Sequence, residues 1–483
     1  MTSPAGQLNQ SLVGFILFRL QSRGGRHARF GIHRLLRVHG PPYGRTSRQN
    51  AGPTGTHQEE TGMAKATGNI GVSRREFGLL AGAAGLSFGL MPGFAGRVLA
   101  QDAESAASVI QGKSGEMLIH NAKLGVMETP ISLLRQHAHT PKEILFNRLH
   151  FPPEGSSAWQ ATTSAPGRED WVLRVDGLVQ RPREVSLADL KAMAQEKRVA
   201  VMQCAGNGRS FYAAKQKVAG GQWKNGGMGN VEWEGVPLRA FLEAMKLGPS
   251  DQATWLTAGG WDQPPTPEGS DFAKSYRIDD AALDNAIIAL KMNGAPIPAV
   301  HGGPVRLIIP GYYGNMNVKF LTTLLFDAAQ SPSAYQSMGY RVPLNPVEPG
   351  EFGRNDYTLE NSAPTYAHKI KSVIFSPLPE DNPKSGAVTV TGVAFNDGTS
   401  PITKVEVSTD GGATWAEADI APPESPWAWY HWSAQGTLSS GTNVLMSRAT
   451  DALGNTQPID GLSRWNPRGY EWNGVEHLEV ATA

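Results

Sequence analysis

Residues 200–212 read Ala-Val-Met-Gln-Cys-Ala-Gly-Asn-Gly-Arg-Ser-Phe-Tyr, and they contain Cys204, the only cysteine among the 483 residues. The apolar run that begins at Val199 predicts a short buried strand, and the glycines after the thiol predict a loop. A strand that ends in such a loop presents its last side chain at a cleft, where Arg209 would favour the thiolate. A single cysteine excludes an internal disulfide, so this thiol is a reactive group, a metal ligand or a core residue.

The composition narrows the class of protein. A chain of 483 residues suggests two or three domains, and 40% hydrophobic residues are enough for sizeable cores. The formal net charge of +1 gives no sign of nucleic-acid binding. The 55 glycines and 34 prolines indicate a chain rich in loops and strands rather than a helical bundle.

The first hundred residues carry the pattern of a targeting segment. Residues 73–77, Ser-Arg-Arg-Glu-Phe, precede a run of small and apolar residues, and residues 98–100 suit cleavage by a signal peptidase. This pattern predicts a twin-arginine signal over residues 63–100, export of the folded protein to the periplasm, and no stable membrane span after signal removal. Residues 1–62, with eight arginines against two glutamates, are interpreted as a doubtful or disordered N-terminal extension.

After the targeting segment, two regions of the chain differ in how their apolar residues are spaced. Between residues 130 and 345, strands and helices occur without regular alternation, which predicts an α+β domain. From residue 366 to residue 483, apolar and polar residues alternate between glycine-containing turns, as is typical of an immunoglobulin-like β-sandwich. Ser186 and Asp189 predict a helix N-terminus. Further elements are predicted at residues 171–179, 236–245, 286–291 and 305–309, and in the sandwich at 370–375, 387–394, 402–408 and 443–449.

Several common catalytic motifs are absent from the sequence. It contains no Cys-x-x-Cys pair, no covalent haem motif, no glycine-rich nucleotide motif and no nucleophile elbow. What remains is a set of cationic and aromatic residues that are spread through the first domain. These candidates are Arg148, His150, Cys204, Arg209, Trp223, His301, Arg306, Lys319 and Tyr340.

Seven sequence blocks in a fixed order make residues 130–483 resemble the sulfite oxidase family, and most of all its bacterial periplasmic sulfite dehydrogenases. Each block alone is a weak signal, whereas the ordered set is specific. The blocks are Cys-Ala-Gly-Asn-x-Arg from Cys204, Gly-Gly-Gln-Trp-x-Asn-Gly-x-Met-Gly-Asn from Gly220, His-Gly-x-Pro-Val-Arg-Leu-Ile-Ile-Pro-Gly-Tyr-Tyr-Gly from His301, Val-Lys-Phe-Leu from Val318, and three sandwich blocks at 405–415, 427–429 and 465–469.

The resemblance implies a molybdenum ion held by one molybdopterin, with Cys204 as the thiolate ligand from the protein. A single protein sulfur is all that such a centre needs. The resemblance also implies that His150, His301, Arg306 and Lys319 bind the pterin and its phosphate, a dianion that favours cationic side chains.

A second set of residues is implied to act on the substrate. Three guanidinium groups would bind the sulfite anion by paired hydrogen bonds, and one tryptophan would line their pocket. The implied catalytic set is Tyr340, Arg148, Arg209, Arg468 and Trp223, with Tyr335 as the alternative to Tyr340 because the spacing differs by about one residue. Gly208 departs from the vertebrate relatives, which have a second arginine at this position.

The function implied by the resemblance is periplasmic oxidation of sulfite to sulfate. Because the sequence has no haem motif or cytochrome b5-like domain, the electrons are expected to pass to an external c-type cytochrome or haem subunit. The sandwich resembles the family's dimerisation domain, which implies a homodimer or a heteromer. The alternatives are a sulfane dehydrogenase-like component of a thiosulfate-oxidising complex, another molybdenum oxo-transferase, or a cofactor-free periplasmic binding protein.

Overall fold

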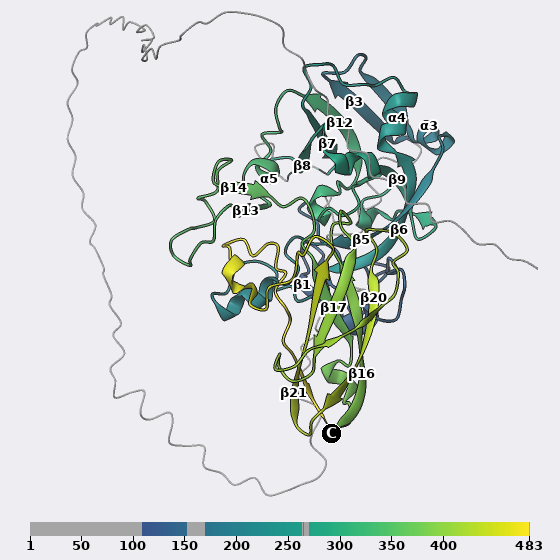
Figure 1. The fold of residues 1–483 in the computed structure, drawn as a ribbon. Helices are drawn as coiled ribbons and strands as arrows, with labels where there is room; N and C mark the ends of the chain where they lie inside the picture. Colours follow the sequence, from purple (N-terminus) through teal and green to yellow (C-terminus); the bar gives the residue numbers. More distant parts are fainter. Residues whose placement is uncertain (1–108, 152–169, 263, 265–269, 483) are drawn as a thin grey trace, which may run out of the picture. The chain divides into compact units, whose positions relative to one another are not determined.

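The computed structural model describes residues 109–151, 170–262, 264 and 270–482 (Figure 1). The predicted extension over residues 1–62 and the predicted signal over residues 63–100 lie outside these ranges. Within them, strands and short helices mix irregularly in the first part, and two packed sheets form the last part. The predicted α+β fold with a C-terminal β-sandwich is therefore confirmed. No helix in these ranges is both long enough and apolar enough to cross a membrane.

One five-stranded sheet carries the cysteine loop. Its strands pair in the order β10-β9-β6-β5, and β11 also pairs with β9. The run Ala200-Val-Met202 is buried at the end of β5, as the apolar pattern predicted, and Cys204 follows this strand directly. The strands are β5 (Glu196–Gln203), β6 (Met228–Pro237), β9 (Ile287–Met292), β10 (Ala295–Pro296) and β11 (Arg306–Ile308).

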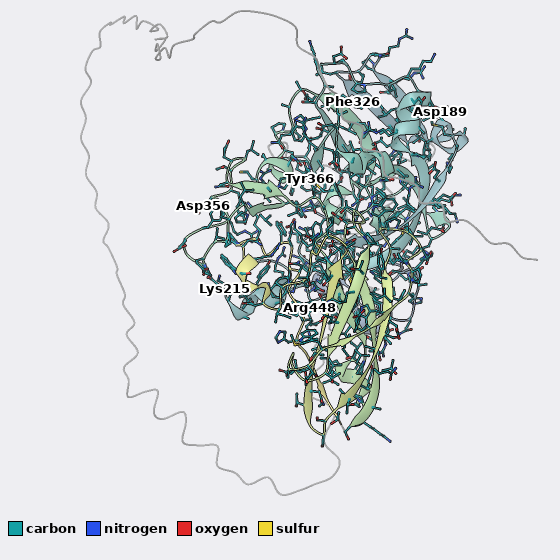
Figure 2. The ribbon with its side chains drawn as sticks, viewed as in Figure 1. Asp189, Lys215, Phe326, Asp356, Tyr366 and Arg448 are labelled. Atoms are coloured by element: carbon teal, nitrogen blue, oxygen red, sulfur yellow. The ribbon has the colours of Figure 1, made fainter. Side chains whose placement is uncertain are left out.

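A second five-stranded sheet has the order β4-β3-β12-β7-β8. β12 runs parallel to β3 and antiparallel to β7, and its residues Leu324 and Phe326 join the largest apolar core (Figure 2 labels Phe326). The strands of this sheet are β3 (Val172–Gly177), β4 (Arg183–Ser186), β7 (Trp255–Gly260), β8 (Ala273–Arg277) and β12 (Leu321–Asp327).

The helices of the first domain are short. The predicted cap of α3 (Leu187–Ala192) is present, because the backbone of Asp189 donates to Ser186 Oγ and the Asp189 carboxylate accepts from the backbone of Ser186 (Figure 2 labels Asp189). The other α-helices are α2 (Ile131–Leu134), α4 (Leu238–Ala244) and α5 (Ala334–Ser337). α4 begins two residues later than the pattern predicted, since β6 continues to Pro237.

The C-terminal domain consists of two four-stranded sheets, ordered β15-β16-β20-β19 and β18-β17-β21-β22. Their inward residues form a separate apolar core that includes Val390, Val405, Trp432 and Leu445. The strands are β15 (Lys371–Ser376), β16 (Gly386–Phe395), β17 (Ile402–Ser408), β18 (Ala416–Glu417), β19 (Asp419–Ile420), β20 (Tyr430–Leu438), β21 (Thr442–Asp451) and β22 (Leu478–Ala481).

Smaller elements connect these layers. An N-terminal hairpin pairs β1 with β2, and β13 pairs with β14 ahead of the sandwich. The elements are β1 (Leu118–Asn121), β2 (Val126–Glu128), β13 (Arg341–Pro343) and β14 (Ser362–Pro364), with 3-10 helices η3 (Arg209–Ala214), η4 (Ala281–Asn285), η5 (Ala299–His301), η6 (Gly314–Met316), η7 (Pro379–Asp381) and η8 (Gly461–Arg464).

Candidate active site

Cys204 lies where β5 ends and a glycine-containing loop begins. Its backbone N–H donates to the carbonyl of Gly227 at 2.8 Å, and the N–H of Gly206 donates to Sγ at 3.4 Å. Burial raises the pKa of the Cys204 thiol, and Arg209 lowers it by a smaller amount. The sequence-based expectation that Arg209 favours the thiolate is therefore outweighed in this structure by burial.

A cavity opens beside this thiol. Seven of the ten predicted site residues line it, and they come from segments far apart in the chain. Tyr340 is the one predicted site residue with a phenol group in the cavity wall. Asp262 is the one carboxylate among the described residues that line the cavity. The predicted residues that line the cavity are Arg148, His150, Cys204, His301, Arg306, Lys319 and Tyr340.

Two cations of the cavity wall, and a third that contacts a wall residue, have no carboxylate of the described residues within ion-pair distance. Lys319 Nζ donates to Asn147 Oδ1 at 3.1 Å and to a backbone carbonyl, and Arg306 donates to the backbone carbonyls of His301 and Asn317. Lys113, which the sequence analysis did not identify, lies 2.9 Å from His301 Nε2. None of these three cations forms an ion pair within the described ranges.

The lowered pKa values of these three cationic groups show that burial disfavours their charged forms. Burial lowers the pKa of Lys113 to about 7 and that of Arg306 to about 9, and it holds the pKa of Lys319 well below its ordinary value. Buried positive charge is unfavourable unless an anion compensates it. The cluster therefore fits a ligand with several negative charges, and the phosphate of a molybdopterin is such a group.

Tyr340 and His150 form a hydrogen-bonded pair in the cavity wall. Tyr340 Oη lies 2.6 Å from His150 Nε2. Burial, reinforced by Arg148, holds the pKa of His150 well below its ordinary value, and burial raises the pKa of Tyr340. The neutral imidazole therefore accepts and the phenol donates. Tyr335 packs edge-on against His150 at 4.8 Å but does not line the cavity, so the geometry favours Tyr340 over this alternative.

The three predicted substrate arginines do not meet in one wall. Arg148 lines the cavity, where its guanidinium donates to a backbone carbonyl. Arg209 donates to the backbone carbonyl of Arg468 at 3.1 Å and lies over the ring of Tyr470 at 5.4 Å. Arg468 lies over Tyr357 at 4.6 Å. Arg209 and Arg468 are thus neighbours outside the lining residues, and their predicted roles in binding substrate stay predictions.

Trp223 does not line the cavity either. It is 1% exposed and packs between His120 and Phe146, with ring centroids 4.8 and 6.0 Å away. Cys204 packs against the same apolar cluster. The large apolar ring of Trp223 is buried behind the loop, and its predicted place in the wall of the substrate pocket stays a prediction.

A C-terminal segment completes the surroundings of the cysteine loop. The backbone N–H of Glu471 donates to Ala205 at 2.9 Å, and Tyr470 stacks on Tyr340 with a centroid distance of 5.2 Å. A Cβ added to Gly208 would lie 2.5 Å from the ring of Trp472. These three residues directly follow the family block 465–469, but no role was predicted for them from the sequence.

Comparisons with known proteins agree with this geometry. The model of the oxidoreductase molybdopterin binding domain matches residues 160–335, and that of the Mo-co oxidoreductase dimerisation domain matches residues 362–479. Sulfite oxidase of Gallus gallus is 31% identical over 355 residues, which are 71% of this chain and 73% of that protein. The chain belongs to the sulfite oxidase family. Its cofactor is therefore molybdenum bound by molybdopterin, and the protein is a molybdenum-dependent oxidoreductase.

Two further relatives show how much of this chain, and of each relative, the similarity covers. Mitochondrial sulfite oxidase of Drosophila melanogaster is 28% identical over 370 residues, 73% of this chain but only 61% of that protein. The crystal structure of the sulfane dehydrogenase SoxCD from Paracoccus pantotrophus has a TM-score of 0.63 and 27% identity, and the match covers 81% of this chain and 95% of that one. The family scaffold is thus shared by proteins named for different sulfur substrates.

Proposed function

We propose that this protein oxidises sulfite to sulfate in the periplasm and passes the electrons to an external c-type cytochrome. The observation that carries the proposal is the single thiol, Cys204, beside a cavity whose cations have no carboxylate partners. The likeness to sulfite oxidases over 71% of the chain supports the choice of substrate. The twin-arginine pattern at residues 73–77 supports the location, and the absence of a haem motif from the sequence supports an external acceptor.

The residues of the cavity divide the work between cofactor and substrate. Cys204 would supply the sulfur ligand, while Lys113, His301, Arg306 and Lys319 would hold the phosphate of the pterin. When bound, molybdenum supplies the two-electron oxidation. The protein's own contribution is electrostatic preorganisation, because fixed cations stabilise anions without rearranging during the reaction.

Three other side chains would act on the substrate. Arg148 would attract the sulfite anion, and Tyr340 would offer its hydroxyl hydrogen while His150 holds that hydroxyl in place. Burial raises the pKa of Asp262 to about 6, so this carboxyl is ionised at neutral pH and reduces the positive charge that faces the substrate. The balance between Arg148 and Asp262 would then tune affinity for an anion.

Sulfane oxidation is the second candidate. The observation that favours it is the match to sulfane dehydrogenase SoxCD, which covers 95% of that chain. In either case, we propose that the C-terminal sandwich forms the contacts of a homodimer or of a heteromer with a cytochrome subunit, as its match to the dimerisation domain suggests.

The test is sulfite-dependent reduction of cytochrome c and of ferricyanide by protein whose molybdenum content has been measured. We expect turnover with both acceptors in the wild type and its loss in Cys204→Ser, in which the hard hydroxyl replaces a soft thiolate ligand. Molybdenum-replete protein that is inert towards sulfite with both acceptors would contradict the proposal. Turnover of a sulfane substrate by the same sample would then establish the second candidate.

A further inference from the structure

Glu128 is a buried carboxylate outside the cavity to which neither the sequence analysis nor the proposed reaction assigns a role. It ends β2 and is 2% exposed. Its two oxygens accept three hydrogen bonds: from His120 Nε2 at 2.7 Å, from the backbone N–H of Lys224 at 3.1 Å and from that of Gly226 at 2.8 Å. A buried carboxylate held mainly by backbone amides fixes the path of the backbone that donates to it.

The segment that Glu128 holds, residues 223–227, is the one that holds the cysteine loop. Cys204 donates from its backbone to Gly227 at 2.8 Å, Gly208 donates to Lys224 at 2.7 Å, and Ser210 donates to Trp223 at 3.0 Å. The backbone of Gly227 donates in turn to Asn207 Oδ1 at 2.9 Å. Four hydrogen bonds therefore join the two segments, and one of them is made by the backbone of Cys204 itself.

The fit around this segment leaves little room for it to shift. A Cβ added to Gly226 would lie 1.8 Å from the carbonyl oxygen of Thr129 and 2.9 Å from Cγ of Glu128. His120, which also hydrogen-bonds to Glu128, packs against Trp223 with a ring-centroid distance of 4.8 Å. The Glu128 carboxylate thus holds residues 224 and 226 directly, through their backbone amides. It also contacts Trp223 indirectly, through His120.

A second carboxylate touches the same segment in a different way. Glu476 Oε2 accepts one hydrogen bond of 2.6 Å, from the side chain of Asn225. A side-chain contact of this kind leaves the backbone free to move about its own dihedral angles. Glu128 therefore has the stronger hold on the backbone of residues 224–226.

We propose that Glu128 is a positioning residue that fixes the backbone of residues 223–227 and, through it, the place of Cys204 Sγ before and after the cofactor binds. The proposal rests on the family's cofactor and not on which sulfur compound is oxidised. Its consequence is that Glu128 controls how well the protein presents its one sulfur ligand, although it touches neither the cofactor nor the substrate.

Because Cys204 is the single cysteine, a thiol reagent reads its surroundings without interference. The test compares full-length wild type with Glu128→Gln, purified from cells that lack the cofactor, by the rate at which an aromatic disulfide reagent labels Cys204. We expect labelling to be about tenfold faster in Glu128→Gln, because a charge-assisted acceptor for two amides becomes a neutral one. Purified from cofactor-producing cells, the variant should also contain less molybdenum per chain.

The matched control is Glu406→Gln. Glu406 also accepts charged hydrogen bonds, from Arg448 on β21 in the sandwich (Figure 2 labels Arg448), but it belongs to the other domain. This variant should label at the wild-type rate. Where Glu128→Gln does not fold, Glu128→Asp serves instead, since it keeps the charge with a shorter reach and should give a smaller increase. A folded Glu128 variant with wild-type labelling and wild-type molybdenum content would overturn the proposal, whatever its activity towards sulfite.

Discussion

The hydrogen bond of 2.6 Å between Tyr340 and His150 sets the direction of one proton in the cavity. Burial lowers the pKa of His150, and nearby cationic side chains such as Arg148 lower it further. The imidazole is therefore neutral and accepts the hydrogen bond. Tyr340 therefore keeps its proton and presents a hydroxyl group of fixed orientation to the cavity. The side-chain nitrogen of Lys274 lies 5.4 Å from the centre of the Tyr340 ring.

Replacing Tyr340 with phenylalanine should lower kcat/KM for the oxidised substrate by about tenfold, which is the loss expected for one hydrogen bond of about 1.4 kcal/mol. Steady-state kinetics at neutral pH with ferricyanide as the acceptor measure this loss. The control is Tyr335→Phe, because Tyr335 packs against His150 without lining the cavity. An equal loss in both variants would contradict the distinction drawn here.

At the same scale, the sequence predicted some site residues and not others. Cys204 was identified because it begins a family block, and Tyr340 because its spacing nearly matches that of the family's tyrosine; the structure places both at the cavity. Lys113 was not identified, since it lies in a polar segment where an exposed lysine is expected. Trp223 was assigned to the wall from its block alone, and its burial depends on how His120 and Phe146 pack, which no local pattern encodes.

At the scale of elements, the active site depends on contacts between the cysteine loop and the C-terminal segment. Gly208 has φ of +87°, and Trp472 fills the space beside it. Only glycine adopts such a backbone angle without strain, and only glycine leaves room for the indole ring. Trp472 of the C-terminal segment thus occupies the space that a side chain at position 208 would need.

Replacing Gly208 with alanine should lower the free energy of unfolding by more than about 1 kcal/mol and also lower activity, because the new methyl group must displace Trp472. Urea unfolding and a sulfite assay measure the two effects. Gly454→Ala is the matched control, since Gly454 has φ of +81° but no atom within 4 Å of an added Cβ. It should lose stability from backbone strain alone and keep full activity, and parallel activity losses would argue against the packing explanation.

In the sandwich, the alternation of apolar and polar residues was sufficient to predict some strands from the sequence. The alternation at residues 387–394 and 402–408 predicted β16 and β17, because both have one face in the sandwich core. β20 (Tyr430–Leu438) was not predicted, although it pairs with β16 along its whole length. Its inward residues Tyr430, Trp432, Ala434 and Leu438 alternate with polar residues and lie in the sandwich core, so the period-two pattern was present in the sequence but was not identified.

For the whole molecule, the net charge of +1 does not show that three of its lysines, Lys113, Lys274 and Lys371, are buried. Burial lowers the pKa of Lys113 and of Lys274 to about 7, and that of Lys371 to about 8. In the unfolded chain these amines regain their ordinary pKa near 10.5. Between those values the unfolded chain binds more protons than the folded one, so the stability of the folded state rises with pH.

The cofactor-free protein should therefore gain free energy of unfolding as the pH rises from 7 to 9. Urea unfolding at several pH values measures the slope, and Lys113→Met should reduce it because one buried amine is removed. The molybdopterin-loaded protein should show a smaller slope, since the phosphate keeps Lys113 protonated in the folded state. A slope that does not change in Lys113→Met would contradict the assignment of the shift to this lysine.

The contacts of residues 470–472 with Ala205, Tyr340 and Gly208 impose an order on biosynthesis. A ribosome releases the chain from its N-terminus, so the cysteine loop emerges more than 250 residues before the partners that complete it. Until residues 470–472 leave the exit tunnel, the loop lacks the backbone donor of Glu471 and the ring of Trp472. Insertion of the metal centre into a finished pocket can therefore begin only after residues 470–472 have left the ribosome and packed against the loop.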